Sequence, residues 1–121
     1  MDSQQNVERK GGSMRLGAYD CIVRRSTKTY SAYGADRISE RHRHRYEFNP
    51  EFRTKFEEGG FIVAGESPDG TLAEVMELST HPWFVCCQYH PELKSRPTKP
   101  HPLFRELLGA AVKRQLAQAA E

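Results

Sequence analysis

The chain has 121 residues, enough for one domain or a large part of one. Its 18 Lys and Arg nearly balance its 16 Asp and Glu, which argues against nucleic acid or a membrane surface as the main partner. No apolar stretch approaches the roughly 18 residues of a membrane span, and the N-terminus lacks the apolar core of a signal peptide. We therefore expect a cytoplasmic protein.

The three cysteines, Cys21, Cys86 and Cys87, predict reduced structural thiols. Their odd number does not fit a disulfide framework, and two of them are adjacent, which is awkward for a bridge. Adjacent cysteines also lack the usual spacing of a zinc site, so we expect no metal ion in this chain.

In the first half of the chain, the polar residues 1–13 predict a flexible lead-in. Short apolar patches predict strands at 14–16 and 21–23. Residues 27–34 predict a short helix that ends at a glycine, and 37–48 predict an unusually charged strand.

A clear helix start lies at Asn49, because asparagine is a favourable cap and a proline and a glutamate follow it. Phe52 and Phe56 are four residues apart and therefore share one face. Gly59 and Gly60 predict the end of this helix.

The second half predicts a hairpin, with strands at 61–65 and 71–78 joined by a type I turn at 67–70. The apolar run 83–89 predicts a buried strand. It begins with Trp83 and a phenylalanine, Phe84, which are both expected in the core.

A stiff connection with three prolines at 95–102 leads into the last predicted helix, at 103–119. Its apolar residues recur with helical spacing and indicate one buried face: Phe104, Leu107, Leu108 and Ala111. We divide the chain into the lead-in, a main domain at 14–117 and a tail at 118–121.

The most informative stretch ends the apolar run, where a glutamine and a tyrosine precede His90, Pro91 and Glu92. Pro91 cannot continue a strand ladder, so a bend can bring His90 and Glu92 to one side. A carboxylate on one ring nitrogen would leave the other nitrogen to act as base and then as acid. A capped core histidine beside a solvated charge gives the same pattern, so these residues alone leave both interpretations open.

Four stretches, in family order from about residue 11 to about 114, resemble the CTP synthase family of class I glutamine amidotransferases. The Gln-Tyr-His-Pro-Glu run at 88–92 is shared with other triad amidotransferases. The other three are characteristic of this family: Gly11–Gly17, Ser39–Glu47, and Lys94–Pro97 with His101–Phe104. The resemblance implies an α/β fold, as the C-terminal part of a flavodoxin-like, three-layer amidotransferase domain.

The resemblance also implies roles. His90 would be the catalytic base and Glu92 its orienting carboxylate, in a reaction where a cysteine thiolate attacks the side-chain amide of L-glutamine. Arg45 would bind the carboxylate of glutamine, since a planar guanidinium can form two parallel bonds to it. The ammonia would pass to a synthase domain that uses ATP and Mg²⁺ to aminate UTP to CTP, an ATP-dependent ligase reaction of pyrimidine biosynthesis.

The sequence departs from the family at the nucleophile. The family's cysteine lies in a glycine-flanked elbow, and none of the three cysteines has such neighbours. No phosphate-cradling loop of a synthase domain is present either. We therefore expect an inactive fragment with no cofactor of its own. Its expected partners are glutamine, the synthase domain and the cysteine-bearing half of the amidotransferase domain, within a homo-oligomeric enzyme.

The basic run at 41–45 has competing interpretations. As a strand it would place three arginines on one face and two histidines on the other. The resemblance favours glutamine binding by Arg45, with salt-bridged, partly exposed neighbours. A phosphate or nucleic-acid patch fits the near-neutral charge poorly, and His42 and His44 lack the further ligands that zinc needs.

Two other functions remain open: a non-catalytic module that pairs with a separate cysteine-bearing chain, and a relative that only binds glutamine. His101 is expected at the entry to the last helix, and His81 in a loop without a functional role.

Overall fold

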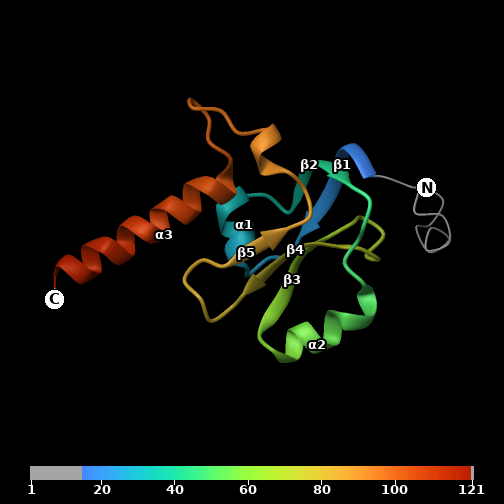
Figure 1. The fold of residues 1–121 in the computed structure, drawn as a ribbon, viewed down its shortest axis with the longest axis horizontal. Coiled ribbons are helices and arrows are strands. Elements are labelled where there is room, and N and C mark those ends of the chain that lie inside the picture. The colour runs from blue at the N-terminus through green and yellow to red at the C-terminus, as the bar shows by residue number, and fades with distance from the viewer. Residues whose placement is uncertain (1–14, 121) are drawn as a thin grey trace.

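The computed structural model describes residues 15–120, so the predicted lead-in at 1–13 lies outside the described residues. Five strands form one antiparallel sheet in the order β2-β1-β3-β4-β5 (Figure 1). They are β1 (Arg15–Val23), β2 (Arg37–His44), β3 (Phe61–Glu66), β4 (Ala73–Leu78) and β5 (Val85–Cys87).

Helices flank this sheet, in agreement with the α/β prediction. They are α1 (Lys28–Tyr33), the 3-10 turn η2 (Pro50–Phe52), α2 (Arg53–Glu58), the 3-10 turn η3 (Pro91–Leu93) and α3 (Pro102–Ala119). The short helix α1 contacts β3, β4 and α3, whereas α2 contacts β3. The long helix α3 projects away from the sheet (Figure 1).

The local signals of the sequence locate several of these boundaries. The helix α1 is capped by the side chain of Thr27 and ends at Gly34, which has a φ of 69° that favours glycine. Asn49 caps η2 with its side chain. In the predicted turn, the N–H of Gly70 donates to the carbonyl of Ser67 at 2.8 Å.

Two strand predictions need correction. The sequence predicted two short strands near the start, but β1 is continuous, because it pairs with β2 from Arg15 to Ile22. The two apolar patches are simply the ends of this strand. Its partner β2 ends at His44, before the predicted end at residue 48.

The prediction of a buried strand at 83–89 is also wrong. The strand in this region, β5, has only three residues, pairs only with β4 and forms an edge of the sheet. Cys86 is exposed, and Phe84 is 45% exposed rather than in the core. Trp83 packs against the core but is only partly buried. An edge strand has a neighbouring strand on one side only, which explains why residues 83–89 are more exposed than predicted.

The predicted last helix is present, but its apolar stripe is not buried. Leu103 is the one buried residue of α3, whereas Leu107 is 50% and Leu108 66% exposed. This exposure agrees with the course of α3, most of which extends away from the sheet (Figure 1). The helix runs to Ala119, so it includes the first residues of the predicted tail.

The sheet curls until its two edges meet. Beyond β5, the N–H of Gln88 donates to the carbonyl of Glu74 on β4 at 3.0 Å. Two residues later, the N–H of His90 donates to the carbonyl of Arg41 on β2, the opposite edge strand, at 2.9 Å. The curl needs close contact inside the sheet, and a Cβ atom on Gly65 would lie only 2.8 Å from the Cys21 sulfur.

The inside of the curl holds charged side chains as well as apolar ones. Glu40, Glu74 and Glu77 are each at most 2% exposed. Glu77 on β4 accepts hydrogen bonds from the backbone N–H groups of Lys28 and Thr29, at 2.9 and 3.0 Å, and from the Thr29 hydroxyl at 3.1 Å. This carboxylate therefore fastens the start of α1 to the sheet, and it sits where the helix dipole favours a negative charge.

Replacing Glu77 with Ala should lower the free energy of unfolding by about 2–4 kcal/mol, because it leaves one buried N–H group, one partly buried N–H group and a buried hydroxyl without an acceptor. Urea unfolding followed by circular dichroism measures this change. Glu58→Ala, at an exposed position of α2, is the matched control and should change stability by less than about 0.5 kcal/mol. Equal effects of the two substitutions would contradict the anchoring role.

The three thiols are shielded to different degrees. Burial raises the pKa of Cys21 to about 12, and burial does the same for Cys87. Cys86 is more exposed, although partial burial still raises the pKa of its thiol. Since the thiolate is the reactive form, none of them is activated as a nucleophile.

Alkylation with iodoacetamide at pH 8 should therefore modify the folded chain slowly and at Cys86 first, at least about tenfold faster than at Cys21. All three thiols should react once the chain is unfolded in denaturant. Peptide mass spectrometry identifies the modified residue. Alkylation of Cys21 as fast as that of Cys86 would show that the core around β1 is open.

Candidate active site

The bend after β5 brings His90 and Glu92 together. His90 is the residue that precedes the 3-10 turn η3, and Pro91 occupies the first position of this turn. The Nδ1 atom of His90 lies 2.6 Å from Oε1 of Glu92. The two side chains are 37% and 58% exposed, so the pair lies at the surface and can be reached from solvent.

The pair has a defined electrostatic character. The hydrogen bond from His90 lowers the pKa of Glu92 below its ordinary value, so the carboxylate is ionised at neutral pH. An ionised carboxylate can only accept, and the Nδ1 atom of His90 must therefore carry the proton. In the neutral ring this leaves the lone pair on Nε2, which can accept a proton from a reacting group.

Hydrogen bonds to the backbone of β2 hold this bend in place. The N–H of His90 donates to the carbonyl of Arg41, and the ammonium group of Lys94 donates to the carbonyl of Ser39. Within the turn, the N–H of Leu93 donates to the carbonyl of His90 at 3.1 Å. The segment that carries His90 and Glu92 is thus held at both ends by one strand.

Arg45, the third residue predicted for the site, directly follows β2 and is exposed. The arginines at 41, 43 and 45 are exposed and His42 is buried, so the two faces of the strand differ as the alternation predicted. His42, however, is only 1% exposed, which corrects the expectation of a partly exposed, salt-bridged neighbour.

His42 is buried because it belongs to a polar cluster that crosses the curl. Its Nδ1 lies 2.7 Å from Nε2 of His44, and its Nε2 lies 3.1 Å from the carboxylate of Glu74, which also pairs with Arg15 at 2.5 Å. Burial, and then the nearby Arg15 charge, lower the pKa of His42 to about 3. Across residues 15–120, no three possible ligands are arranged to hold a metal ion.

The sequence interpretation missed a second buried polar group next to the site. It consists of Tyr33, Glu40, Tyr89 and His101, joined through the hydroxyl of Tyr33. His101 does cap α3, as expected, by accepting from the N–H of Leu103. The alternation of side chains along β2 could have indicated this group, since Glu40 and His42 lie on the face opposite to the exposed arginines.

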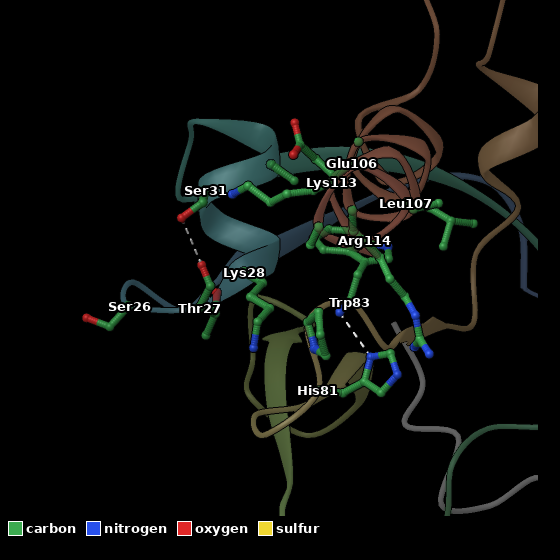
Figure 2. A pocket seen from close by; sticks show the side chains of 16 residues that line it. Ser26, Thr27, Lys28, Ser31, His81, Trp83, Glu106, Leu107, Lys113 and Arg114 are labelled. Atoms are coloured by element: carbon green, nitrogen blue, oxygen red, sulfur yellow. Dashed lines mark hydrogen bonds between the residues drawn. The ribbon is translucent and has the colours of Figure 1, made fainter. Parts of the chain in front are cut away.

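A large open groove lies elsewhere on the molecule (Figure 2). It is bounded by the start of α1, the turn at 81–83 and one flank of α3, and its lining includes none of the three predicted site residues. His81 lines it and accepts a hydrogen bond from the N–H of Trp83 at 3.0 Å, which stabilises the turn. The groove is therefore separate from the paired histidine and glutamate.

Comparisons with known proteins agree with this fold. Residues 2–110 match the family "Glutamine amidotransferase class-I". The chain is 53% identical over its full length to a CTP synthase of Bacillus velezensis, of which it covers 22%. It is 56% identical over 113 residues to a CTP synthase of Carboxydothermus hydrogenoformans, of which it covers 21%.

A solved structure shares the fold. It is the glutaminase domain of Trypanosoma brucei CTPS with bound acivicin, and it matches with a TM-score of 0.83 and 30% identity. The match covers 93% of this chain and 44% of that one. The chain spans about a fifth of the length of the curated relatives that it matches. The chain therefore belongs to the class I glutamine amidotransferase family.

Proposed function

We propose that this chain is the part of a CTP synthase glutaminase domain that supplies the catalytic base and its orienting carboxylate. The observation that carries the proposal is the 2.6 Å contact between His90 and Glu92 at a bend fixed by β2. It occurs in a chain that is 53–56% identical to CTP synthases.

The proposed chemistry is hydrolysis of the side-chain amide of L-glutamine. Nε2 of His90 takes the proton of a cysteine thiol, the resulting thiolate attacks the amide carbon, and Nε2 then gives that proton to the departing ammonia. The same nitrogen then takes a proton from the water that attacks the thioester, which releases glutamate and restores the thiol nucleophile. Glu92 stabilises the imidazolium that forms, and Arg45 binds the α-carboxylate of glutamine.

The nucleophile in this proposal is supplied from outside the described residues. A catalytic thiol needs a pKa near or below the working pH, whereas burial raises the pKa of Cys21, Cys86 and Cys87 alike. The chain then acts as a fragment of a longer cytoplasmic, homo-oligomeric enzyme. Its synthase domain binds ATP and Mg²⁺ and uses the ammonia to convert UTP to CTP.

A second candidate is a non-catalytic module that pairs with a separate chain carrying the cysteine. The exposed apolar side chains of α3 favour it, since Leu107, Leu108 and Leu116 are 50–66% exposed and a surface of this kind is typical of a protein interface. The two candidates share the same histidine and glutamate.

The isolated chain should release no glutamate from glutamine above the level of its His90→Ala variant, because loss of the nucleophile in a catalytic triad costs on the order of a million-fold in turnover. A coupled glutamate assay on the two purified chains measures this. Turnover that depends on His90 would contradict the assignment of all three thiols as structural.

A chimera tests the roles directly. This chain would replace the matching segment of the Bacillus velezensis CTP synthase, to which it is 53% identical over its full length. With glutamine as the nitrogen source, His90→Ala should lower CTP formation by about a thousandfold or more. With ammonium chloride instead, CTP formation should stay within about twofold, because free ammonia bypasses the glutaminase step.

The control variant is His81→Ala, which removes a histidine of the exposed turn outside the site. It should leave both reactions within about twofold of the parent chimera. Equal loss of the glutamine-driven and ammonia-driven reactions in His90→Ala would contradict a role in glutamine hydrolysis, and so would an unchanged glutamine-driven rate.

A further inference from the structure

Four side chains from distant parts of the chain meet beside the His90 bend. Tyr89 precedes His90, Tyr33 ends α1, Glu40 lies on β2 and His101 caps α3. Glu40 is 1% exposed, and Tyr89 and His101 are each 3% exposed. The proposed glutaminase chemistry uses none of them.

The hydrogen bonds of this group run in one direction. His101 accepts at Nδ1 from the N–H of Leu103, so its proton lies on Nε2, which donates to Oε1 of Glu40 at 2.7 Å. The Tyr33 hydroxyl donates to the same oxygen at 3.0 Å. Since that donation uses its only proton, the Tyr89 hydroxyl must donate to Tyr33 at 2.9 Å. The buried carboxylate of Glu40 is the final acceptor of this series of hydrogen bonds.

The protonation states agree with this direction. Burial raises the pKa of both Tyr33 and Tyr89, so each phenol keeps the proton that it donates.

These hydrogen bonds connect Glu40 and its neighbours on β2 to the residues before and after His90. Tyr89 precedes His90, and the N–H of His90 is bonded to the carbonyl of Arg41, which follows Glu40. Beyond Glu92, the Lys94 ammonium lies 3.8 Å from Oε1 of Glu40 and donates to the carbonyl of Ser39. Three consecutive residues of β2 therefore hold the segment before, at and after His90.

We propose that Glu40 is a positioning residue for His90, and that it acts through the hydroxyls of Tyr33 and Tyr89. The proposal rests on the proposed function of His90. A buried carboxylate is weak evidence for stability, because desolvation can cancel its attractions, and its better use is to specify one arrangement. The second oxygen of Glu40 has no hydrogen-bond partner among residues 15–120, in keeping with a group retained for geometry.

The test is Tyr33→Phe in the full chain, followed by NMR. This change removes one oxygen and breaks the path from Tyr89 to Glu40. We expect the backbone amide of His90 to exchange with solvent at least about tenfold faster than in the parent chain. We also expect the pKa of the Glu92 carboxyl to rise toward its value in a His90→Ala chain, because the 2.6 Å contact loosens.

The matched control is Tyr30→Phe. Tyr30 lies on the same short helix, and its hydroxyl makes no hydrogen bond within the part of the chain that the structure describes. It should leave both readouts unchanged. Unaltered exchange at His90 and an unaltered Glu92 titration in Tyr33→Phe would overturn the proposal. Equally faster exchange of the β3 and β4 amides would also overturn it, because that indicates only a general loss of stability.

If Tyr33→Phe fails to fold, Tyr89→Phe is read in the same way, since it removes only the first donor of the path. Neither readout depends on turnover. A chimera in which His90→Ala keeps its glutamine-driven rate would refute the proposed function, while the NMR result would still decide whether Glu40 fixes the bend.

Discussion

The hydrogen bond from the N–H of His90 to the carbonyl of Arg41 is the contact on which the site depends. The strand order places β2 and β5 at opposite edges, so this bond exists only because the sheet curls. The curl follows from uneven pairing: β1 pairs with β2 along almost its whole length but with β3 only at Ile22 and Val23. Away from these two residues β1 is no longer paired with β3, and the side chain of Arg15 on β1 contacts Glu74 on β4.

A curled sheet of this size has a narrow interior, and much of it is polar. Glu40, His42, Glu74 and Glu77 are almost fully buried beside an apolar cluster that includes Cys21 and Val75. Taking a charge out of water costs several kcal/mol unless partners replace the solvent. Glu40, Glu74 and Glu77 each have such a partner on another strand or helix. The polar interior therefore fixes which segments meet, while the small apolar core supplies the general driving force.

Local chemistry made much of this structure predictable. Thr27, Gly34, Asn49 and the turn at 67–70 act through their own neighbours, and Pro91 forces the bend that joins His90 to Glu92. Features that depend on remote segments were not predictable. An apolar run does not reveal whether a strand is central or at an edge, which is why β5 was expected to be buried. A strand rich in arginine and histidine suggests exposure, and only the curl reveals that one of its faces is enclosed.

The proposed mechanism needs a thiol nucleophile in addition to His90 and Glu92. An imidazole whose Nδ1 is tied to a carboxylate is a complete acid–base unit, and β2 fixes its position with backbone bonds. A thiol nucleophile would have to approach Nε2, on the side of the ring away from Glu92. Cys87 is the nearest thiol in sequence, but it donates to the carbonyl of Tyr89, and burial raises its pKa to about 12. Under the proposed mechanism a thiol from outside the described residues approaches His90 from solvent, to which 37% of this side chain is exposed.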